Sequence, residues 1–206
     1  MPSPAHGLTQ PERVETSRRR LLQAAAELIV EKGWDATTAA EIGRRAGYSR
    51  AMVHARYGSK DAILESFLHE HVKRLNPDPD PKTSGMDQVL AHFDRIEEIY
   101  TEDHELLLAM FVATFEAVKT TSPLRERVRD QLRNGAEKVE MGLRKGIRDG
   151  SVRSGIDIAR AVNEISTAVF GIAFWWTALS DQYDLGRELT SVRARIVGNY
   201  GGPALD

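Results

Sequence analysis

The chain has 206 residues, with 28 Lys or Arg, 30 Asp or Glu and no cysteine, so its formal net charge is −2. This is long enough to bury a core, and the missing cysteine excludes disulfides, thiol catalysis, iron–sulfur clusters and thiolate zinc sites. The N-terminus lacks a basic start followed by an apolar run, and no apolar stretch reaches about 18 residues, so we expect a cytoplasmic protein with no membrane partner.

Apolar residues recur at spacings of three and four along the chain, which predicts amphipathic helices and no strand. The first helix should start at the capping box of residues 9–12 and end at Gly33. Two short helices should follow. The first is capped by Thr38 and stops at Gly47, and the second is capped by Ser49.

A fourth helix should begin after Ser59, and the three prolines within residues 76–85 then exclude helix continuity. Ser122-Pro123 has the pattern of a helix cap and first turn. Beyond the prolines we expect helices at about 86–101, 103–120, 123–149, 157–180 and 186–199. The prediction is an all-α chain of about nine helices, with a small N-terminal unit and a larger bundle.

The near-neutral total charge hides an uneven distribution. Residues 1–60 contain ten Lys or Arg and six Asp or Glu, a balance of +4, whereas the remainder contains 18 and 24, a balance of −6. Such asymmetry points to a polyanion-binding module, although a charge of +4 can equally belong to a solvated surface.

Residues 37–64 have the pattern of a helix-turn-helix. Gly47 can take the left-handed conformation that ends one short helix tightly before the next begins. Ile42, Ala46 and Val53 stand where the two helices and the first helix should pack. The second helix of the pair is then the candidate for the DNA major groove.

Three consecutive blocks, EKGWDATT, TAAEIGRRAGYS and AMVHARYGSKDAIL, carry the most specific signal, including Tyr57, Ser59, Lys60, Asp61 and Leu64. With them the chain resembles the TetR family of bacterial transcriptional regulators over about residues 12–70, and by architecture alone beyond. The resemblance implies a disordered arm at 1–11, a helix-turn-helix DNA-binding domain at 12–58, and an effector-binding and dimerisation domain at 59–206. A connecting helix would span 59–75.

The resemblance also implies which side chains meet double-stranded DNA. Phosphates would be contacted by Thr38, His54, Arg56 and Lys60, with His54 standing where the family often has tyrosine. Base edges would be met by Arg50, Ala51 and Ala55. Further candidates are Arg44, Arg45 and Tyr48, for which solvated surface or, for the tyrosine, interhelical core is the alternative.

By the same resemblance, the last two long helices would form a homodimer. The apolar stripe available for it comprises Ile165, Val169, Ile172, Trp176, Val192 and Ile196. Intramolecular core is the alternative for this stripe. A two-fold dimer would hold two recognition helices roughly 34–36 Å apart, about one turn of DNA.

In the family the body also binds a small effector. The candidate lining is Phe93, Ile96, Tyr100, Met110, Phe111, Phe115, Glu116, Met141, Phe174 and Trp175, with polar groups such as His92 and Thr114 among them. Plain core packing is the alternative for each apolar residue. A carboxylate in an apolar run needs a partner, either a cationic group of the ligand or a basic side chain at a helix end.

The function predicted is a ligand-responsive transcriptional regulator, a repressor that binds a palindromic operator and is released by a small, largely apolar effector; activation stays open. One rival is a helical metal-binding enzyme, but His69 and His71 would face apart on a helix and no nucleophile or nucleotide motif occurs. We expect no catalytic residue, metal or cofactor. The other rival, an interaction protein that does not bind DNA, would not need Ser59-Lys60.

Overall fold

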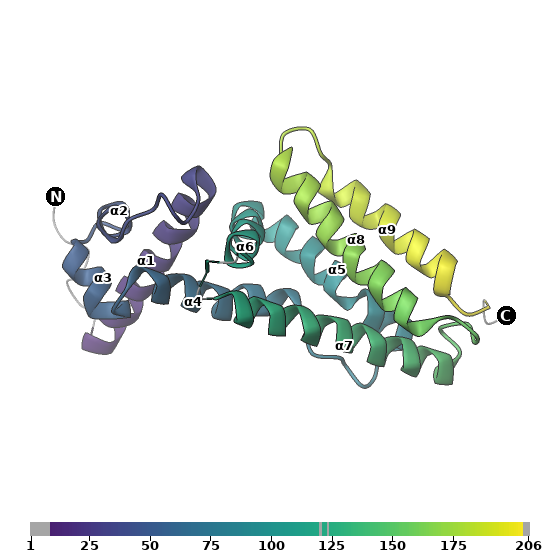
Figure 1. Cartoon of the computed structure of the whole chain (residues 1–206). Helices are drawn as coiled ribbons and strands as arrows, with labels where there is room; N and C mark the ends of the chain where they lie inside the picture. The colour runs from purple at the N-terminus through teal and green to yellow at the C-terminus, as the bar shows by residue number, and fades with distance from the viewer. Residues whose placement is uncertain (1–8, 120, 123, 204–206) are drawn as a thin grey trace.

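A computed structural model of the chain describes residues 9–119, 121–122 and 124–203. Within these ranges it contains nine α-helices and one 3-10 turn, and its sole β pairing is an isolated bridge between Val152 and Gly201 (Figure 1). The all-α prediction is confirmed. No helix in the described ranges has both the length and the hydropathy needed to cross a bilayer.

Helices α1 (Gln10–Lys32), α2 (Ala39–Arg45) and α3 (Arg50–Tyr57) form a unit at one end of the molecule. The backbone N–H of Thr9 donates to the Glu12 carboxylate at 2.7 Å, so the expected capping box starts α1. Gln10 and Pro11 are therefore helical rather than part of an arm, and residues 1–8 of that arm lie outside the described residues.

The turn between α2 and α3 is tight. Gly47 has a φ of 78°, and a Cβ on Gly43 would lie 2.8 Å from the backbone of Ser49. Ile42 and Val53 are fully buried where the two helices meet α1. This is the helix-turn-helix geometry that the sequence pattern predicts.

The expected connecting helix of residues 59–75 is two pieces. Helix α4 (Lys60–Glu70) begins at Ser59, whose hydroxyl accepts the N–H of Ala62, and the 3-10 turn η1 (Val72–Leu75) follows a break at His71. The proline-containing loop after η1 is fixed to the body by lysines: Lys138 Nζ donates to the carbonyl of Asn76 at 2.9 Å.

The body consists of α5 (Gly85–Glu102), α6 (His104–Ala117), α7 (Arg125–Asp149), α8 (Ile158–Ala178) and α9 (Leu185–Tyr200). Each agrees with a predicted helix to within about three residues. Leu124 is the N-cap of α7 and has no side-chain cap, and Pro123 of the expected Ser122-Pro123 signal lies outside the described residues.

Two helix pairs, α1 with α6 and α5 with α7, define the packing. Helix α1 packs on α2 and α4 and also on α6, so it joins the N-terminal unit to the body. The most extensive helix pair is α5 with α7, which cross so closely that a Cβ on Gly85 would lie 2.0 Å from the backbone nitrogen of Gly146. Glycine at residue 85 is thus a condition for this crossing.

We predict that Gly85→Ala lowers the free energy of unfolding by about 2 kcal/mol, because the new methyl group overlaps the backbone of α7. Gly135→Ala is the matched control, since a Cβ there would lie 3.4 Å from the side chain of Asn76. The control should be neutral or stabilising by up to about 1 kcal/mol, because alanine favours helix. Urea unfolding measures both, and equal effects would contradict the close crossing.

Candidate DNA-binding surface and ligand cavity

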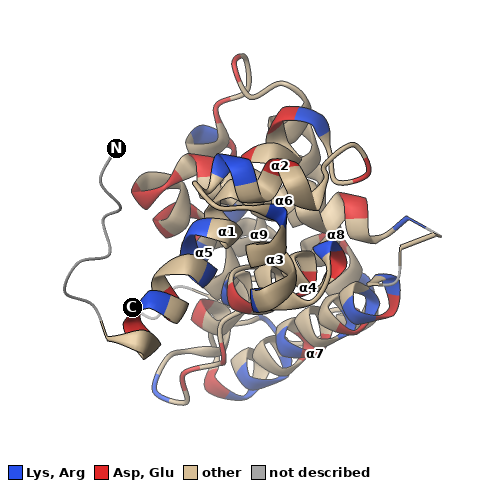
Figure 2. Ribbon diagram, turned by 90° about the vertical axis from the view of Figure 1, so that its left-hand side faces the viewer, with Lys and Arg blue, Asp and Glu red and all other residues tan. Residues whose placement is uncertain are grey.

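The exposed face of the helix-turn-helix lies at the free end of the molecule. Figure 2 views this end, where basic segments on α2 and α3 stand among acidic ones. On α3 the side chains of Arg50, Ala51, His54 and Ala55 are exposed, whereas Val53 is buried. The three residues expected to meet base edges are therefore accessible together on one short helix.

Thr38 is exposed, but both of its hydrogen-bond donors are occupied. Its backbone N–H and its hydroxyl donate to the Glu41 carboxylate at 3.0 and 2.8 Å. Hydrogen bonds from Lys32 and Thr38 lower the pKa of Glu41 to about 2, so this carboxylate is charged at neutral pH. A phosphate contact by Thr38 requires displacement of Glu41.

Lys60 lies inward rather than free in solvent. Its Nζ donates to the carbonyls of Trp34 and Thr37 at 2.8 and 3.0 Å and stands 4.9 Å from the centre of the Trp34 ring. The indole N–H of Trp34 in turn donates to Asp61 at 3.2 Å. These contacts, which we call the Trp34 clamp, tie the first turn of α4 to the loop after α1. An ammonium has three hydrogens, so one remains for a phosphate.

Two of the other basic candidates are held by α1. Arg45 forms a two-pronged ion pair with Glu31 at 2.7 and 2.8 Å, and this pair raises the pKa of the guanidinium. Arg56 donates to the hydroxyl of Ser17 at 2.7 Å. Both arginines orient the short helices against α1, whereas Arg44 is exposed with no partner in the described part of the chain.

His54 is positioned in a way that limits it as a donor. Its Nδ1 lies 2.9 Å from the carbonyl of Gly58, and its Nε2 accepts from Arg50 Nε at 3.4 Å. Because a carbonyl only accepts and a guanidinium only donates, this arrangement fits the neutral ring with its proton on Nδ1. His54 must then rotate away from these partners before it can donate to a phosphate. Tyr48 is half-buried at the α2–α3 turn.

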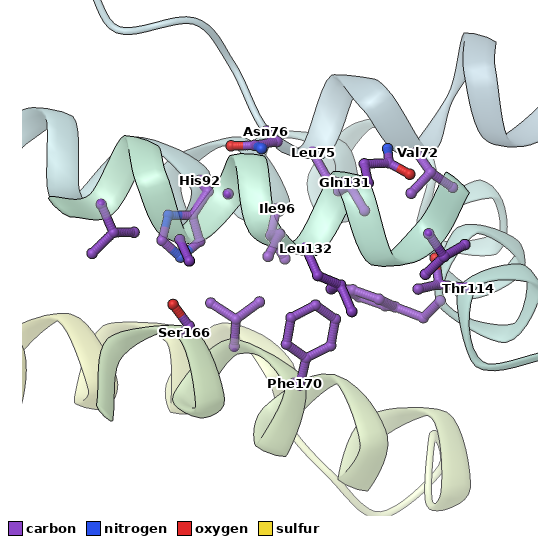
Figure 3. Close-up of a pocket in the computed structure, with 16 residues that line it drawn as sticks. Val72, Leu75, Asn76, His92, Ile96, Thr114, Gln131, Leu132, Ser166 and Phe170 are labelled. Atoms are coloured by element: carbon purple, nitrogen blue, oxygen red, sulfur yellow. The ribbon is translucent and has the colours of Figure 1, made fainter. Parts of the chain in front are cut away.

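The body contains a partly open cavity of about 110 Å³ lined by residues of η1, α5, α6, α7 and α8 (Figure 3). Its lining is Val72, Leu75, Asn76, His92, Ile96, Phe111, Thr114, Val128, Gln131, Leu132, Gly135, Ala136, Val139, Ser166, Val169 and Phe170. Of the sequence candidates, Ile96 and Phe111 line it, together with the polar residues His92 and Thr114.

The other eight candidates lie elsewhere. Phe93 and Met110 are buried core, and Tyr100 and Phe115 pack edge-on against Trp176 and Phe174. Met141, Phe174 and Trp175 are more than half exposed, and Glu116 pairs with Lys119 at 2.5 Å. Most of the aromatic candidates therefore lie in the core or on the surface, and the cavity is lined by other residues.

From α7, sequence reasoning named only Met141 as cavity lining and missed the residues of this helix that line the cavity. Val128, Leu132, Gly135, Ala136 and Val139 follow one another at spacings of one to four residues and form one face of an otherwise charged helix. This face could have been recognised in the sequence, because the small and apolar face of an otherwise charged helix packs against other apolar side chains.

The apolar stripe expected to form a dimer faces inward. Ile165, Val169, Ile172, Trp176, Val192 and Ile196 are all less than a tenth exposed within the single chain. The opposite face of α8 carries Thr167, Gly171, Phe174, Trp175 and Ala178, all exposed, and α9 beside it exposes Val197 and Gly198. We call this second set the α8–α9 face, and among the described residues it holds the two exposed aromatic side chains, Phe174 and Trp175.

His69 and His71 do not converge. Nδ1 of His69 lies 2.9 Å from Arg127, whereas the ring of His71 packs on Phe67 with ring centres 4.9 Å apart. The pair therefore offers no shared ligand position.

Comparison with known proteins agrees with this architecture. A family model described as bacterial regulatory proteins of the tetR family matches residues 21–67. An uncharacterized HTH-type transcriptional regulator of Mycobacterium tuberculosis is 31% identical over 140 residues, 66% of this chain and 69% of the relative. The fatty acid metabolism regulator protein of Bacillus subtilis is 22% identical over 86% of this chain and 92% of its own.

Two solved structures have the same fold. A SmeT–triclosan complex aligns with a TM-score of 0.74 at 21% identity, over 92% of this chain and 94% of the other. FadR of Bacillus subtilis in complex with stearoyl-CoA aligns with a TM-score of 0.70 at 22% identity, over 87% and 97%. Both alignments span the N-terminal unit and the body together.

We predict that Lys60→Met lowers the free energy of unfolding by about 2 kcal/mol, because methionine can still cover Trp34 but leaves the Thr37 carbonyl without its donor and removes one of the two donors to the Trp34 carbonyl. Lys82→Met is the control, since Lys82 is exposed and its side chain has no partner in the described residues. Thermal and urea unfolding measure both variants. A Lys60→Met chain as stable as the unmodified chain would show that the Trp34 clamp does not hold α4.

Proposed function

We propose that this chain, which belongs to the TetR family and is a DNA-binding transcriptional regulator, is a repressor that binds a palindromic operator as a homodimer. A small, largely apolar molecule in the cavity would release it. The observation that carries the proposal is the course of residues 60–76. Lys60 at the start of this segment is tied to the helix-turn-helix unit, and Val72, Leu75 and Asn76 at its end line the cavity.

For DNA, we place the first turn of α3 in the major groove. Arg50 would read a guanine, and Ala51 and Ala55 would meet base edges. Lys60 would give its third N–H to a phosphate. Thr38 would contact a second phosphate, which would replace the Glu41 carboxylate as the acceptor of its hydrogen bonds. Arg45 and Arg56 are assigned a positioning role, since their donors are committed to α1.

For assembly, we propose that two copies meet through the α8–α9 face. Gly171 and Gly198 let helices approach closely, and Phe174 and Trp175 are 61% and 56% exposed in the single chain. Large aromatic side chains are the residues that most often anchor interfaces. A two-fold dimer also doubles the basic field of the N-terminal unit, which supports useful affinity for DNA.

For control, we propose binding rather than catalysis, in the cytoplasm, with no metal or cofactor. The triclosan complex of SmeT and the stearoyl-CoA complex of FadR support a body that accepts apolar molecules. The effector must bind the DNA-incompetent conformation more tightly, because equal affinity for both conformations would shift nothing.

Base reading is tested with Arg50→Ala, using an operator selected from a random DNA pool. We expect the variant to lose about 1–3 kcal/mol of discrimination at one guanine, because the bidentate contact is gone. Arg45→Ala is the matched control and should keep the same base preference, since its guanidinium is held by Glu31. Fluorescence anisotropy measures both. Unchanged preference in Arg50→Ala would contradict the proposed placement of α3.

Assembly is tested with Trp175→Glu in the α8–α9 face. Because it buries a charge in the interface, we expect the dimer dissociation constant to rise by at least about 30-fold, as for an interface hot spot. Met141→Glu is the control, since Met141 is 52% exposed on α7, outside the α8–α9 face. Analytical ultracentrifugation distinguishes the two. If Trp175→Glu sediments like the control, the dimer does not use this face.

A further inference from the structure

The walls of the cavity carry no formal charge. Among the lining residues, all in the described part of the chain, there is no Asp, Glu, Lys or Arg. Most of the surface is aliphatic or aromatic, from five different elements. A charged group of a ligand would lose its hydration here and find no counter-ion, which is costly in an apolar site.

One hydroxyl in this wall lacks a partner. Oγ of Ser166 is shielded from solvent and forms no hydrogen bond with the described residues. Other helix hydroxyls nearby form local hydrogen bonds. Those of Thr167 and Thr177 on α8, and of Thr114 on α6, each donate to the carbonyl four residues earlier. Ser166 does not, and in Figure 3 its hydroxyl points from α8 into the cavity, toward the side where His92 lies.

His92 is the second polar group at this side of the cavity. Its ring comes from α5, packs on Phe93 with ring centres 4.3 Å apart, and has no hydrogen bond to the described residues. Burial lowers the pKa of His92 to about 4, so the ring is neutral at pH 7 and offers one donor and one acceptor. The hydroxyl of Thr114 is already used on Met110, and the amides of Asn76 and Gln131 also line the cavity; Ser166 and His92 are the polar pair contributed by α8 and α5.

We propose that the cavity selects an uncharged ligand, an apolar small molecule with one hydroxyl or carbonyl oxygen that bonds to Ser166 and His92. Carboxylates and ammonium compounds of the same size are rejected. This inference rests on the proposed function, in which the cavity is the effector site, and it adds the chemical class of the effector. An oxygen placed between the two side chains gives the orphan hydroxyl of Ser166 the partner that buried polar groups need.

The test uses the full chain without DNA and three eight-carbon probes: 1-octanol, octanoate and octylammonium. Isothermal titration calorimetry should show saturable binding of 1-octanol and at least about tenfold weaker binding of both ions, because only the ions must shed a charge's hydration. Octanoate or octylammonium binding as tightly as 1-octanol overturns the proposal. So does the absence of saturable 1-octanol binding.

The polar end is tested with Ser166→Ala, which should weaken 1-octanol binding about fivefold through loss of one neutral hydrogen bond. Thr177→Ala is the matched control, because its hydroxyl on α8 bonds to the carbonyl of Ala173 and the residue belongs neither to the cavity lining nor to the α8–α9 face. Equal 1-octanol affinity in the two variants overturns the assignment of Ser166. Operator binding by the unmodified chain is measured separately. A failure to bind DNA refutes the proposed function, whereas the calorimetry tests the ligand class independently of that outcome.

Discussion

Residues 60–76 belong to both candidate sites, and this shared segment is the constraint on which the rest of the structure depends. At its start the Trp34 clamp joins α4 to the loop after α1, and at its end Leu75 and Asn76 form part of the cavity wall. The break at His71 divides the segment into α4 and η1, and Lys138 holds the carbonyl of Asn76 on α7. A ligand that moves η1 therefore acts on the element that positions the DNA-binding unit.

A second connection runs through α6, which packs on α1. Phe111 and Thr114 of this helix line the cavity, and Lys119 just beyond its end reaches Asp35 at 3.2 Å. Because that ion pair is exposed, it contributes little stability by itself, and the packing of α1 on α6 carries the connection. The cavity thus touches both routes by which the N-terminal unit is attached to the body.

The sequence was informative wherever structure is decided locally. Thr9, Thr38 and Ser59 start their helices as their capping patterns predict, because a cap depends on residues three positions away. Contacts between residues far apart in the sequence were not predictable. Lys60 and Trp34, for example, are 26 positions apart. Helical period identified the apolar faces of α8 but not which one turns inward, since two faces of that helix are apolar. The aromatic residues taken as cavity lining proved to be mostly core or surface, because the position of a cavity depends on how helices distant in the sequence pack together.

The most direct measurement is the operator affinity of the full chain with and without a ligand that saturates the cavity. If residues 60–76 link the two sites, the ligand lowers operator affinity by at least about fivefold, and the operator lowers ligand affinity by the same factor, as thermodynamic linkage requires. An operator affinity that is unchanged by every ligand bound in the cavity would contradict the link.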